Sequence, residues 1–381
     1  MGIRGLSALQ LSDKRPSHKK YRIFITGAAG LVGQHIVRLL GNLGHSVVAM
    51  VRPTSDRRGI LEFVRHNQVD VEIVTAELHE QAQLERLMRG CDVIVHAAAV
   101  IDPHGDPAQL RRTNVEGTKS VINAAINAQI KQFIHISSLS VIMGDHDCFG
   151  VTEEEPLRYS REAYANSKID AEKVVMSAKT MSQINVTALR PGFIYGPNEK
   201  TWVRKLIFNM KAGTAMLVGN GSKETNLIYV ENLCRAIELA IMNPVAYGQT
   251  YNLTDGELVT KRQLFDVICD GLDLPRVRIA IPLVFARFCV ELSSVVATMA
   301  PPRLKNRLAI FSWPALRLVG LNQGFDISKA ERELGYTDRI PFADGMARTL
   351  VSFAAEKKTA SQSILDMATV DWNKGAASGQ L

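Results

Sequence analysis

Two residues that could do chemistry together, Tyr164 and Lys168, lie four positions apart in the polar stretch SREAYANSKIDAEK, residues 160–173. A helix would place the phenol and the ammonium on one face, about one turn apart. A phenol, with a pKa of about 10, is a poor base at neutral pH. A nearby ammonium favours the phenolate and lowers that pKa, so such a pair could serve as a general acid and base. A solvated helix with a surface tyrosine has the same spacing, and the rest of the chain must decide between the two.

A glycine-rich loop, ITGAAGLVG, follows the first β-rich run and precedes a helical pattern. Its glycines are Gly27, Gly30 and Gly33. In a strand–loop–helix unit the first glycine permits a tight turn, the second lets a pyrophosphate approach the backbone, and the third lets the helix pack closely on the strand. The helix N-terminus adds unpaired amides and a positive dipole. The loop therefore predicts a dinucleotide site.

The end of the next strand bears on the choice of coenzyme. An acidic residue about 20 positions beyond the loop would bind both ribose hydroxyls and favour NAD(H). Val51 stands at that place, and Arg52 follows it. Arg52, backed by Arg57 or Arg58, could hold a 2′-phosphate through charge-assisted hydrogen bonds. The pattern favours NADP(H), although an Arg52 that stacks on adenine or faces solvent would leave NAD(H) open.

Strand-like and helix-like segments alternate through the first half of the chain. Short apolar runs such as VEIVTA, DVIVHAAA and QFIHISS are separated by helical stretches at 80–89 and 108–129. Such runs are typical of strands buried on both faces of a parallel sheet, and the alternation predicts right-handed crossovers. We therefore expect an α/β fold, a Rossmann doubly wound parallel sheet with a smaller, mainly helical C-terminal substrate domain. The expected boundaries are a basic flexible tail over 1–20, a dinucleotide-binding domain over 21–191 with a returning strand near 225–256, a substrate-binding region over 192–355 and a flexible tail over 356–381.

Charge and cysteine content exclude several functions. The 381-residue chain has a formal net charge of +7, but much of the excess lies in residues 1–20. No groove-reading motif accompanies it, so we expect no nucleic-acid partner. The N-terminus lacks the apolar core of a secretory signal. The 5 cysteines are scattered without a CxxC, which predicts reduced thiols, no metal site and a cytoplasmic location.

Residues 281–300, IPLVFARFCVELSSVVATMA, form the most apolar segment. Arg287 and Glu291 interrupt it at i, i+4, which argues against a membrane-spanning helix. A buried helix of the substrate region is the simpler interpretation. The alternative is a helix that makes peripheral contact with a membrane or lines the entrance for an apolar substrate.

Several short motifs occur in a characteristic order along the chain. They are TGAAGLVG at 26–33, HAAA at 96–99, NVEGT at 114–118, SSLSV at 137–141, YANSK at 164–168 and RPGFIYGP at 190–197. Each is weak alone, and together they are specific. In this order they resemble the extended short-chain dehydrogenase/reductase superfamily, of the NAD-dependent epimerase/dehydratase type, over roughly residues 21–350.

The resemblance implies a catalytic set. Tyr164 is the general acid/base, Lys168 lowers its pKa and bonds the nicotinamide ribose, and Ser138 holds the substrate oxygen. The neighbouring hydroxyls of Ser137 and Ser140 are expected to be structural.

The resemblance also implies supporting and cofactor-binding residues. Asn114 is expected to tie the central strands together, directly or through a water. Glu77 stands where the family commonly has an aspartate beside adenine, which leaves its role open. The full set of expected cofactor contacts is Gly27, Gly30, Leu31, Val32, Gly33, Arg52, Glu77, Leu78, Ala97, Ala98, Tyr164, Lys168 and Pro191.

Two positions bear on the branch of the family. Nucleotide-sugar members commonly carry an asparagine and an arginine at the places held here by Phe193 and Thr225, so a diphosphate substrate would lack its expected partners. The segments VGNGSKETNLIYVENLCRAIELA and GQTYNLTDGELVT, with 281–300, are instead similar to the 3β-hydroxysteroid dehydrogenase and sterol-4α-carboxylate dehydrogenase branch.

This resemblance implies an NAD(P)-dependent enzyme that interconverts a secondary alcohol and a ketone on an apolar, sterol- or lipid-like substrate. A nucleoside-diphosphate-sugar epimerase or dehydratase and a non-catalytic dinucleotide sensor are the alternatives. Family members often dimerise through the helices expected here at 108–129 and 160–182, which makes a homodimer the expected assembly.

Overall fold

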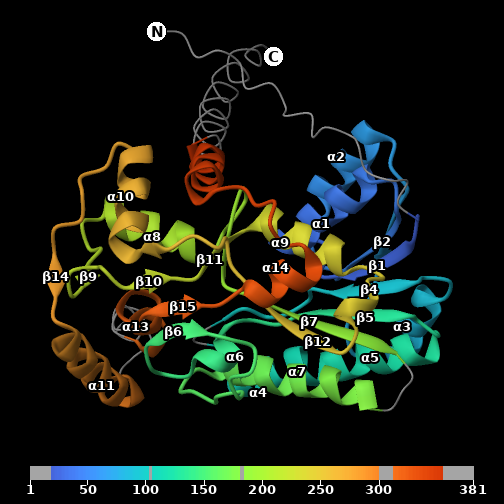
Figure 1. The fold of residues 1–381 in the computed structure, drawn as a ribbon, viewed down its shortest axis with the longest axis horizontal. Coiled ribbons are helices and arrows are strands. Elements are labelled where there is room, and N and C mark those ends of the chain that lie inside the picture. Colours follow the sequence, from blue (N-terminus) through green and yellow to red (C-terminus); the bar gives the residue numbers. More distant parts are fainter. Residues whose placement is uncertain (1–18, 103–104, 181–183, 300–311, 355–381) are drawn as a thin grey trace, which may run out of the picture.

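A seven-stranded sheet organises the chain, and its strand order is β12-β7-β5-β4-β1-β2-β3. The computed structural model describes residues 19–102, 105–180, 184–299 and 312–354. All neighbouring strands of the sheet are parallel, which confirms the doubly wound fold (Figure 1). The strands are β1 (Arg22–Thr26), β2 (Ser46–Val51), β3 (Val71–Thr75), β4 (Val93–His96), β5 (Gln132–Ile136), β7 (Asn185–Pro191) and β12 (Gln249–Leu253).

The strand order reverses between β1 and β4. From β1 the chain builds outward through β2 and β3, then returns to β4 and builds the other way through β5, β7 and β12. The last residues of β1 and β4, Thr26 and His96, lie in register. Ligands of open parallel sheets bind in the crevice beyond the strand ends at such a reversal, so the residues that follow Thr26 and His96 are placed to form a site.

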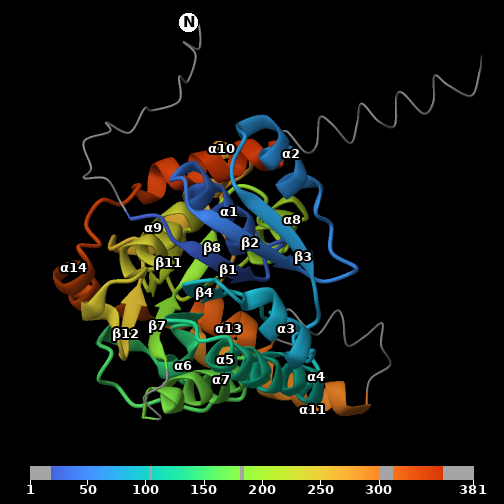
Figure 2. The same cartoon turned by 90° about the vertical axis from the view of Figure 1, so that its right-hand side faces the viewer.

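Helices cover both faces of the sheet (Figure 2). One face carries α1 (Leu31–Asn42), α2 (Arg58–Asn67), α9 (Val230–Ala240) and α14 (Ser328–Leu334). The other carries α3 (Gln81–Met88), α5 (Gly117–Asn127) and α7 (Ala163–Thr180), with α4 (Pro107–Leu110) and a π-helical turn (Arg111–Glu116) leading into α5. Because side chains alternate along a strand, Ile23 and Ile25 of β1 pack toward the α1 side, whereas Phe24 packs against the α3 and α5 side.

The expected boundary between the two regions is less sharp than the sequence pattern suggests. β12 joins the main sheet beside β7, as the predicted returning strand. Helices α9 and α14, which come from the stretch expected to bind substrate, contribute Leu233, Ile237 and Leu334 to the same core as β1 and α1. The described part of this stretch therefore supplies helices to the nucleotide-binding fold as well as to the separate substrate region.

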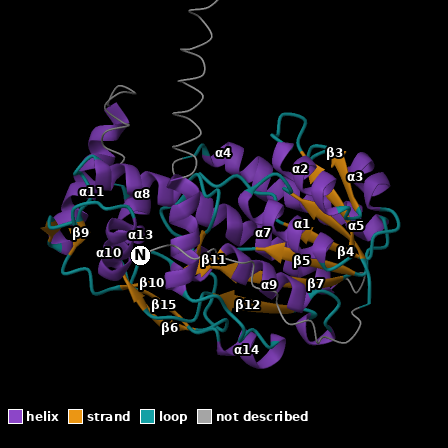
Figure 3. Cartoon of the chain, turned by 90° about the horizontal axis from the view of Figure 1, so that it is seen from above, coloured by secondary structure: helices purple, strands orange, loops and turns teal. Residues whose placement is uncertain are grey.

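The substrate region gathers at one end of the molecule, away from β3 and α3 (Figure 3). As predicted, it is mainly helical, with α8 (Trp202–Lys211), α10 (Lys261–Gly271), α11 (Leu283–Met299), α13 (Trp313–Gly320) and a helix over 342–354. Short two-stranded sheets connect these helices: β6 (Cys148–Val151) with β15 (Gln323–Phe325), β8 (Phe193–Tyr195) with β11 (Leu227–Tyr229), β9 (Leu217–Val218) with β14 (Ala280–Ile281), and β10 (Glu224–Thr225) with β13 (Val259–Thr260).

Helix α11 occupies most of the apolar segment 281–300. Its inner face packs on α13 and β9 through Ala286 and Val290. Its outer face exposes the apolar side chains of Val284, Phe285, Phe288 and Leu292. Among the described residues, no helix has the length and apolarity needed to cross a membrane. Peripheral membrane contact through this helix stays a prediction, as does the homodimer, whose expected helices α5 and α7 pack against each other within the chain.

Candidate active site

One cavity of about 1240 Å³ runs from the glycine-rich loop to the helices of the substrate region. Two residues expected at the site are absent from its wall: Glu77 and Lys168. The structure brings the other predicted site residues together there: Gly27, Gly30, Leu31, Val32, Gly33, Arg52, Leu78, Ala97, Ala98, Ser138, Tyr164 and Pro191.

The loop between β1 and α1 forms a close-packed cradle with no room for a side chain at Gly27 or Gly33. Gly27 has a positive φ of 70°, and a Cβ there would lie 2.8 Å from Ala98 Cα. A Cβ at Gly33 would lie 2.2 Å from Gly27 O, because the helix packs directly on the turn. The N-terminus of α1 has no side-chain cap, which leaves its amides for an anion. These features fit the pyrophosphate of a dinucleotide.

The far end of the cavity has charged residues of both signs in its wall: Arg38, Arg52, Asp56 and Glu62. Arg52 follows β2, is exposed and lines the wall. The predicted support from Arg57 or Arg58 is wrong, because neither lines the cavity and the Arg58 guanidinium instead pairs with Asp56, 2.7 Å away. Arg38 of α1 lines the same end. The sequence around Arg52 gave no indication that Arg38 lines the cavity as well.

The expected role of Glu77 near the adenine has no support in the structure. Glu77 follows β3, and its backbone N–H donates to the Glu80 carboxylate over 2.7 Å. The next side chain, Leu78, reaches the cavity instead. Leu78 packs under the sheet with Val74 and Leu84, so this stretch contributes an apolar contact rather than an acidic one.

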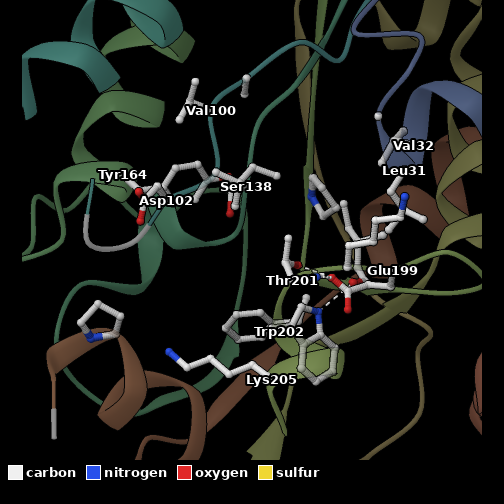
Figure 4. Close-up of a pocket in the computed structure, with 18 of the residues that line it drawn as sticks. Leu31, Val32, Val100, Asp102, Ser138, Tyr164, Glu199, Thr201, Trp202 and Lys205 are labelled. Atoms are coloured by element: carbon white, nitrogen blue, oxygen red, sulfur yellow. Dashed lines mark hydrogen bonds between the residues drawn. The ribbon is translucent and has the colours of Figure 1, made fainter. Parts of the chain in front are cut away.

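The reactive hydroxyls come from two segments that meet beyond β5. Ser138 follows β5, and Tyr164 is the second residue of α7; Figure 4 shows both side chains on the same wall of the cavity. The Ser138 Oγ accepts a hydrogen bond from the backbone N–H of Ser140 over 3.1 Å, which orients the hydroxyl. The structure thus places a phenol and a serine hydroxyl where one substrate oxygen can contact both.

The neighbouring serines behave differently from each other. Ser137, expected to be structural, donates to the buried Glu172 carboxylate over 2.5 Å. Glu172 also binds the buried Arg190 guanidinium, which joins α7 to β7. Ser140, by contrast, lines the cavity, and its buried Oγ has no hydrogen-bond partner among the residues that the structure describes.

The electrostatic surroundings of Tyr164 differ from the prediction. Burial raises the pKa of the phenol, and the carboxylate of Glu162 raises it further. The opposing influence on that pKa comes from the nearby Ser138 hydroxyl, whereas the sequence pointed to the Lys168 ammonium. Tyr164 and Lys168 lie in one helix, α7, as predicted. The Lys168 ammonium, however, is not among the groups that shift the pKa of Tyr164.

Lys168 lies behind the cavity wall. Its side chain is buried, with 3% exposure, and its ammonium donates to the backbone carbonyl of Ile136 over 2.7 Å. Burial lowers the pKa of Lys168 to about 8, and the nearby Glu172 carboxylate counteracts this in part. In this structure Lys168 therefore holds α7 against the end of β5.

Asn114 also has a contact different from the expected one. Its amide Nδ2 donates to Val100 O and to Ser167 Oγ, and its Oδ1 accepts from the Val100 N–H, over 2.8–3.0 Å. The residue thus fastens the loop after β4 to helix α7 by direct hydrogen bonds, and it does not join strands. This contact fixes the segment that carries Tyr164.

A buried ion pair beside Tyr164 was missed. Glu162 accepts a hydrogen bond from the Arg317 guanidinium of α13, and both side chains line the cavity. Their relative exposures are 9% and 3%. Burial raises the pKa of Glu162, and Arg317 opposes that rise. Glu162 lies two residues before Tyr164, within the polar stretch 160–173. Its partner Arg317 is 155 residues away, and no sequence motif marks that arginine.

The substrate end of the cavity is mostly apolar. Phe193, one of the two positions that distinguish the nucleotide-sugar branch, lines it, whereas Thr225 is buried outside it. Helix α8 presents Trp202, Leu206 and other residues of one face to the cavity. Side chains from α11, α13 and β9 complete the wall: Val218, Ala286, Val290, Leu316 and Val319.

Comparison with known families gives a match over most of the region described above. The model of the NAD dependent epimerase/dehydratase family matches residues 23–254. This span contains the glycine-rich loop, Ser138, Tyr164 and the returning strand β12.

Curated relatives match nearly the whole chain. A 3beta-hydroxysteroid-dehydrogenase/decarboxylase from Arabidopsis thaliana is 28% identical, and the match covers 92% of this chain and 83% of that protein. A 2-alkyl-3-oxoalkanoate reductase from Shewanella oneidensis is also 28% identical, with 92% and 90% covered. Among solved structures, a dTDP-glucose 4,6-dehydratase from Streptomyces venezuelae with NAD bound has a TM-score of 0.70 and 24% identity, with 88% of this chain and 98% of that chain covered. The structural likeness concerns the fold.

Proposed function

Because the chain belongs to the NAD dependent epimerase/dehydratase family, we propose that it interconverts a secondary alcohol and a ketone on an apolar, sterol- or lipid-like substrate. One observation carries this proposal. Ser138 and Tyr164 lie on the wall of a cavity that joins the glycine cradle to a largely apolar compartment. A substrate in that compartment can present its oxygen to both hydroxyls while the dinucleotide occupies the cradle.

The residues act at the substrate oxygen. When bound, the nicotinamide supplies or accepts a hydride at the carbon that bears this oxygen. In reduction the neutral Tyr164 phenol donates its proton to the substrate oxygen and becomes the phenolate, and in the oxidative direction the phenolate accepts the hydroxyl proton and becomes the phenol again. Ser138 donates a hydrogen bond to the same oxygen and stabilises its developing charge. Lys168 fixes α7 against the end of β5 through its hydrogen bond to the Ile136 carbonyl.

Two further observations favour an apolar substrate. The compartment walls are formed by Phe193, Val218, Val290 and Leu316, and aliphatic and aromatic side chains contribute binding energy through the apolar surface that they bury. The names of the two curated relatives, a hydroxysteroid dehydrogenase and an oxoalkanoate reductase, support the same substrate class.

For the coenzyme we favour NADP(H) over NAD(H). Arg52 and Arg38 line the end of the cavity where the adenosine ribose would lie, and guanidinium groups bind a 2′-phosphate through charge-assisted hydrogen bonds. Neither guanidinium forms an ion pair with a carboxylate among the described residues.

The alternative substrate class, a nucleoside-diphosphate sugar, is less well served. Phe193 offers no donor to a sugar nucleotide, and Thr225 lies outside the cavity. A diphosphate would therefore lack the asparagine and arginine contacts that the resemblance associates with nucleotide-sugar members. The fold of the dTDP-glucose dehydratase is shared, and fold alone does not choose the substrate.

The test is an assay of coenzyme oxidation and reduction with a 3β-hydroxysteroid, a 2-alkyl-3-oxoalkanoate, UDP-glucose and dTDP-glucose, each with both coenzymes. We expect turnover with an apolar substrate and a preference for the phosphorylated coenzyme. Turnover confined to the nucleotide sugars would replace the proposal with the epimerase or dehydratase alternative. Dinucleotide binding without any turnover would favour a sensor.

A further inference from the structure

We propose that Asn226 is a specificity-determining residue whose amide binds a second, uncharged oxygen of the substrate, a hydroxyl group on its hydrocarbon body. The proposal rests on the proposed function and narrows its substrate class to alcohols and ketones that carry a further hydroxyl group. Ser138 and Tyr164 would hold the reacting oxygen, and Asn226 would hold the other one.

The backbone fixes Asn226 in the cavity wall. The residue immediately precedes β11, and its carbonyl accepts a hydrogen bond from the Phe193 N–H of the neighbouring strand β8 over 2.7 Å. A Cβ at Gly192 would lie 1.9 Å from Asn226 O, so these two backbones are in direct contact. Gly192 and Asn226 both line the cavity, whereas the preceding Thr225 is buried outside it.

A short backbone path joins Asn226 to the reactive hydroxyls. Leu139, the neighbour of Ser138, donates its N–H to Pro191 O over 3.0 Å, and Gly192 follows Pro191. Ser138 and Asn226 therefore flank the end of β7, separated by two strand spacings, or about 10 Å. This separation suits two different oxygens of one substrate molecule.

The Asn226 amide is buried and unpaired. The residue retains 5% exposure, and its Oδ1 has no hydrogen-bond partner among the described residues. Burying an amide without a partner is unfavourable. Three other buried asparagines, Asn114, Asn232 and Asn322, bind protein groups through both ends of the amide. Asn226 thus keeps hydrogen-bonding capacity that no described residue uses.

A hydroxyl group is the partner that suits this amide. An asparagine side chain offers an acceptor at Oδ1 and donors at Nδ2. Because the terminal χ2 torsion is broad, rotation about it turns either end toward a ligand, and a hydroxyl group pairs with both. A neutral group also matches the adjoining wall, since Phe193 and Ile194 beside the amide carry no charge.

Stability shows whether the amide has a structural role instead. Asn226→Leu keeps the approximate side-chain size and removes the amide. Since the amide oxygen has no protein partner, this variant should unfold at the same urea concentration as wild type or a higher one. Asn232→Leu breaks three hydrogen bonds of an equally buried amide and should unfold at a clearly lower concentration. Equal losses in the two variants would overturn the subsite.

Substrate preference tests the subsite directly in the full-length chain. The probes are a 3β-hydroxysteroid with and without a hydroxyl group at the opposite end of its ring system, and a long-chain secondary alcohol with and without a terminal hydroxyl group. We expect wild type to favour a diol by about tenfold in kcat/KM, the value of one hydrogen bond. Asn226→Leu should lose this preference and leave kcat/KM for the mono-alcohols unchanged.

Thr225→Val is the matched control. It removes a buried hydroxyl that also has no partner among the described residues but lies outside the cavity, so it should match wild type on every probe. The same preference lost in Thr225→Val would show a general disturbance of β11 and overturn the subsite.

The remaining outcomes separate this subsite from the proposed function. Equal kcat/KM for diols and mono-alcohols in wild type, or equal losses on both in Asn226→Leu, would overturn the subsite and leave the alcohol–ketone activity standing. Weaker coenzyme binding by Asn226→Leu, measured by fluorescence titration, would assign the amide to the coenzyme and overturn the subsite as well. Turnover of nucleotide sugars alone, or of no probe, would overturn both proposals.

Discussion

The coenzyme half and the substrate half of the cavity are built by different kinds of contact. The coenzyme half is built by close backbone packing: a Cβ at Gly33 would meet Gly27 O, and a Cβ at Gly27 would meet Ala98 Cα in the segment that follows β4. The substrate half depends on ion pairs between side chains. Glu162 binds Arg317 across 155 residues, and Arg161 binds Glu291 across 130.

This difference shows which helices fix the position of Tyr164. The coenzyme cradle is complete once β1, α1 and β4 are formed, whereas the start of α7 is held by the substrate helices. Arg161 pairs with Glu291 of α11 over 2.5 Å and its guanidinium lies 4.6 Å from the Trp313 ring of α13. The helices that line the substrate compartment therefore also position Tyr164.

The largest expected effect separates chemistry from coenzyme binding. Tyr164→Phe removes the hydroxyl that transfers the proton, so kcat should fall about 10³-fold. The dissociation constant of the coenzyme should change less than threefold, because the cradle is untouched. Steady-state kinetics and coenzyme fluorescence titration measure the two quantities. Unchanged kcat would show that this phenol is not the acid/base.

The next effect tests the buried pair that ties the halves together. Arg317→Met leaves the Glu162 carboxylate buried and unpaired, which should lower the free energy of unfolding by about 3 kcal/mol. Arg348→Met, which breaks the exposed pair with Glu231, is the matched control and should cost less than about 1 kcal/mol. Urea denaturation compares them. A double variant with Glu162→Gln should recover part of the loss, and no recovery would contradict the pairing.

A glycine substitution tests the coenzyme half by itself. Gly33→Ala places a Cβ 2.2 Å from Gly27 O and 2.6 Å from Ala28 Cα, so the loop must shift. We expect about a 100-fold weaker coenzyme affinity, measured by calorimetry. Gly41→Ala, in the same helix, meets only side-chain atoms at 3.4 Å and should bind normally. Equal affinity in both variants would mean that the cradle is not the pyrophosphate site.

Coenzyme choice should respond to Arg52. Arg52→Gln removes a guanidinium from the adenosine end, and we expect about a tenfold loss of NADP(H) affinity with little change for NAD(H). If the ratio of NADP(H) to NAD(H) affinity is unchanged in Arg52→Gln, Arg52 does not determine the coenzyme preference. Arg38→Gln would then be the next variant to measure.

The smallest effect concerns pH. Burial lowers the folded-state pKa of Lys168 from 10.5 to about 8, so above that pH the folded chain has released a proton that the unfolded chain still holds. Stability rises with pH wherever the unfolded state binds more protons. Between pH 8 and pH 9 wild type should therefore gain about 1 kcal/mol in unfolding free energy relative to Lys168→Met. Denaturation at both pH values decides this, and parallel slopes for the two proteins would show that Lys168 keeps its ordinary pKa.

The sequence was sufficient for the sheet, the glycine cradle and the placement of Tyr164 and Ser138, because these depend on local periodicity and motif order. It was insufficient for side chains whose partners are distant. Glu162 could be read beside Tyr164, but nothing marked Arg317 as its partner. Lys168 and Glu77 were predicted to contact the coenzyme, but neither lines the cavity. The spacing of a motif does not specify the direction of a side chain. For Lys168 that direction depends on the carbonyl of Ile136, which accepts its hydrogen bond.

The bond between Glu162 and Arg317 also has a bearing on biosynthesis. Every strand of the main sheet has been translated by residue 253, before α13 begins at Trp313. A growing chain that has closed its sheet therefore still carries an unneutralised carboxylate next to its reactive phenol. Translation of the late helix, rather than closure of the sheet, is the event that completes the surroundings of the phenol.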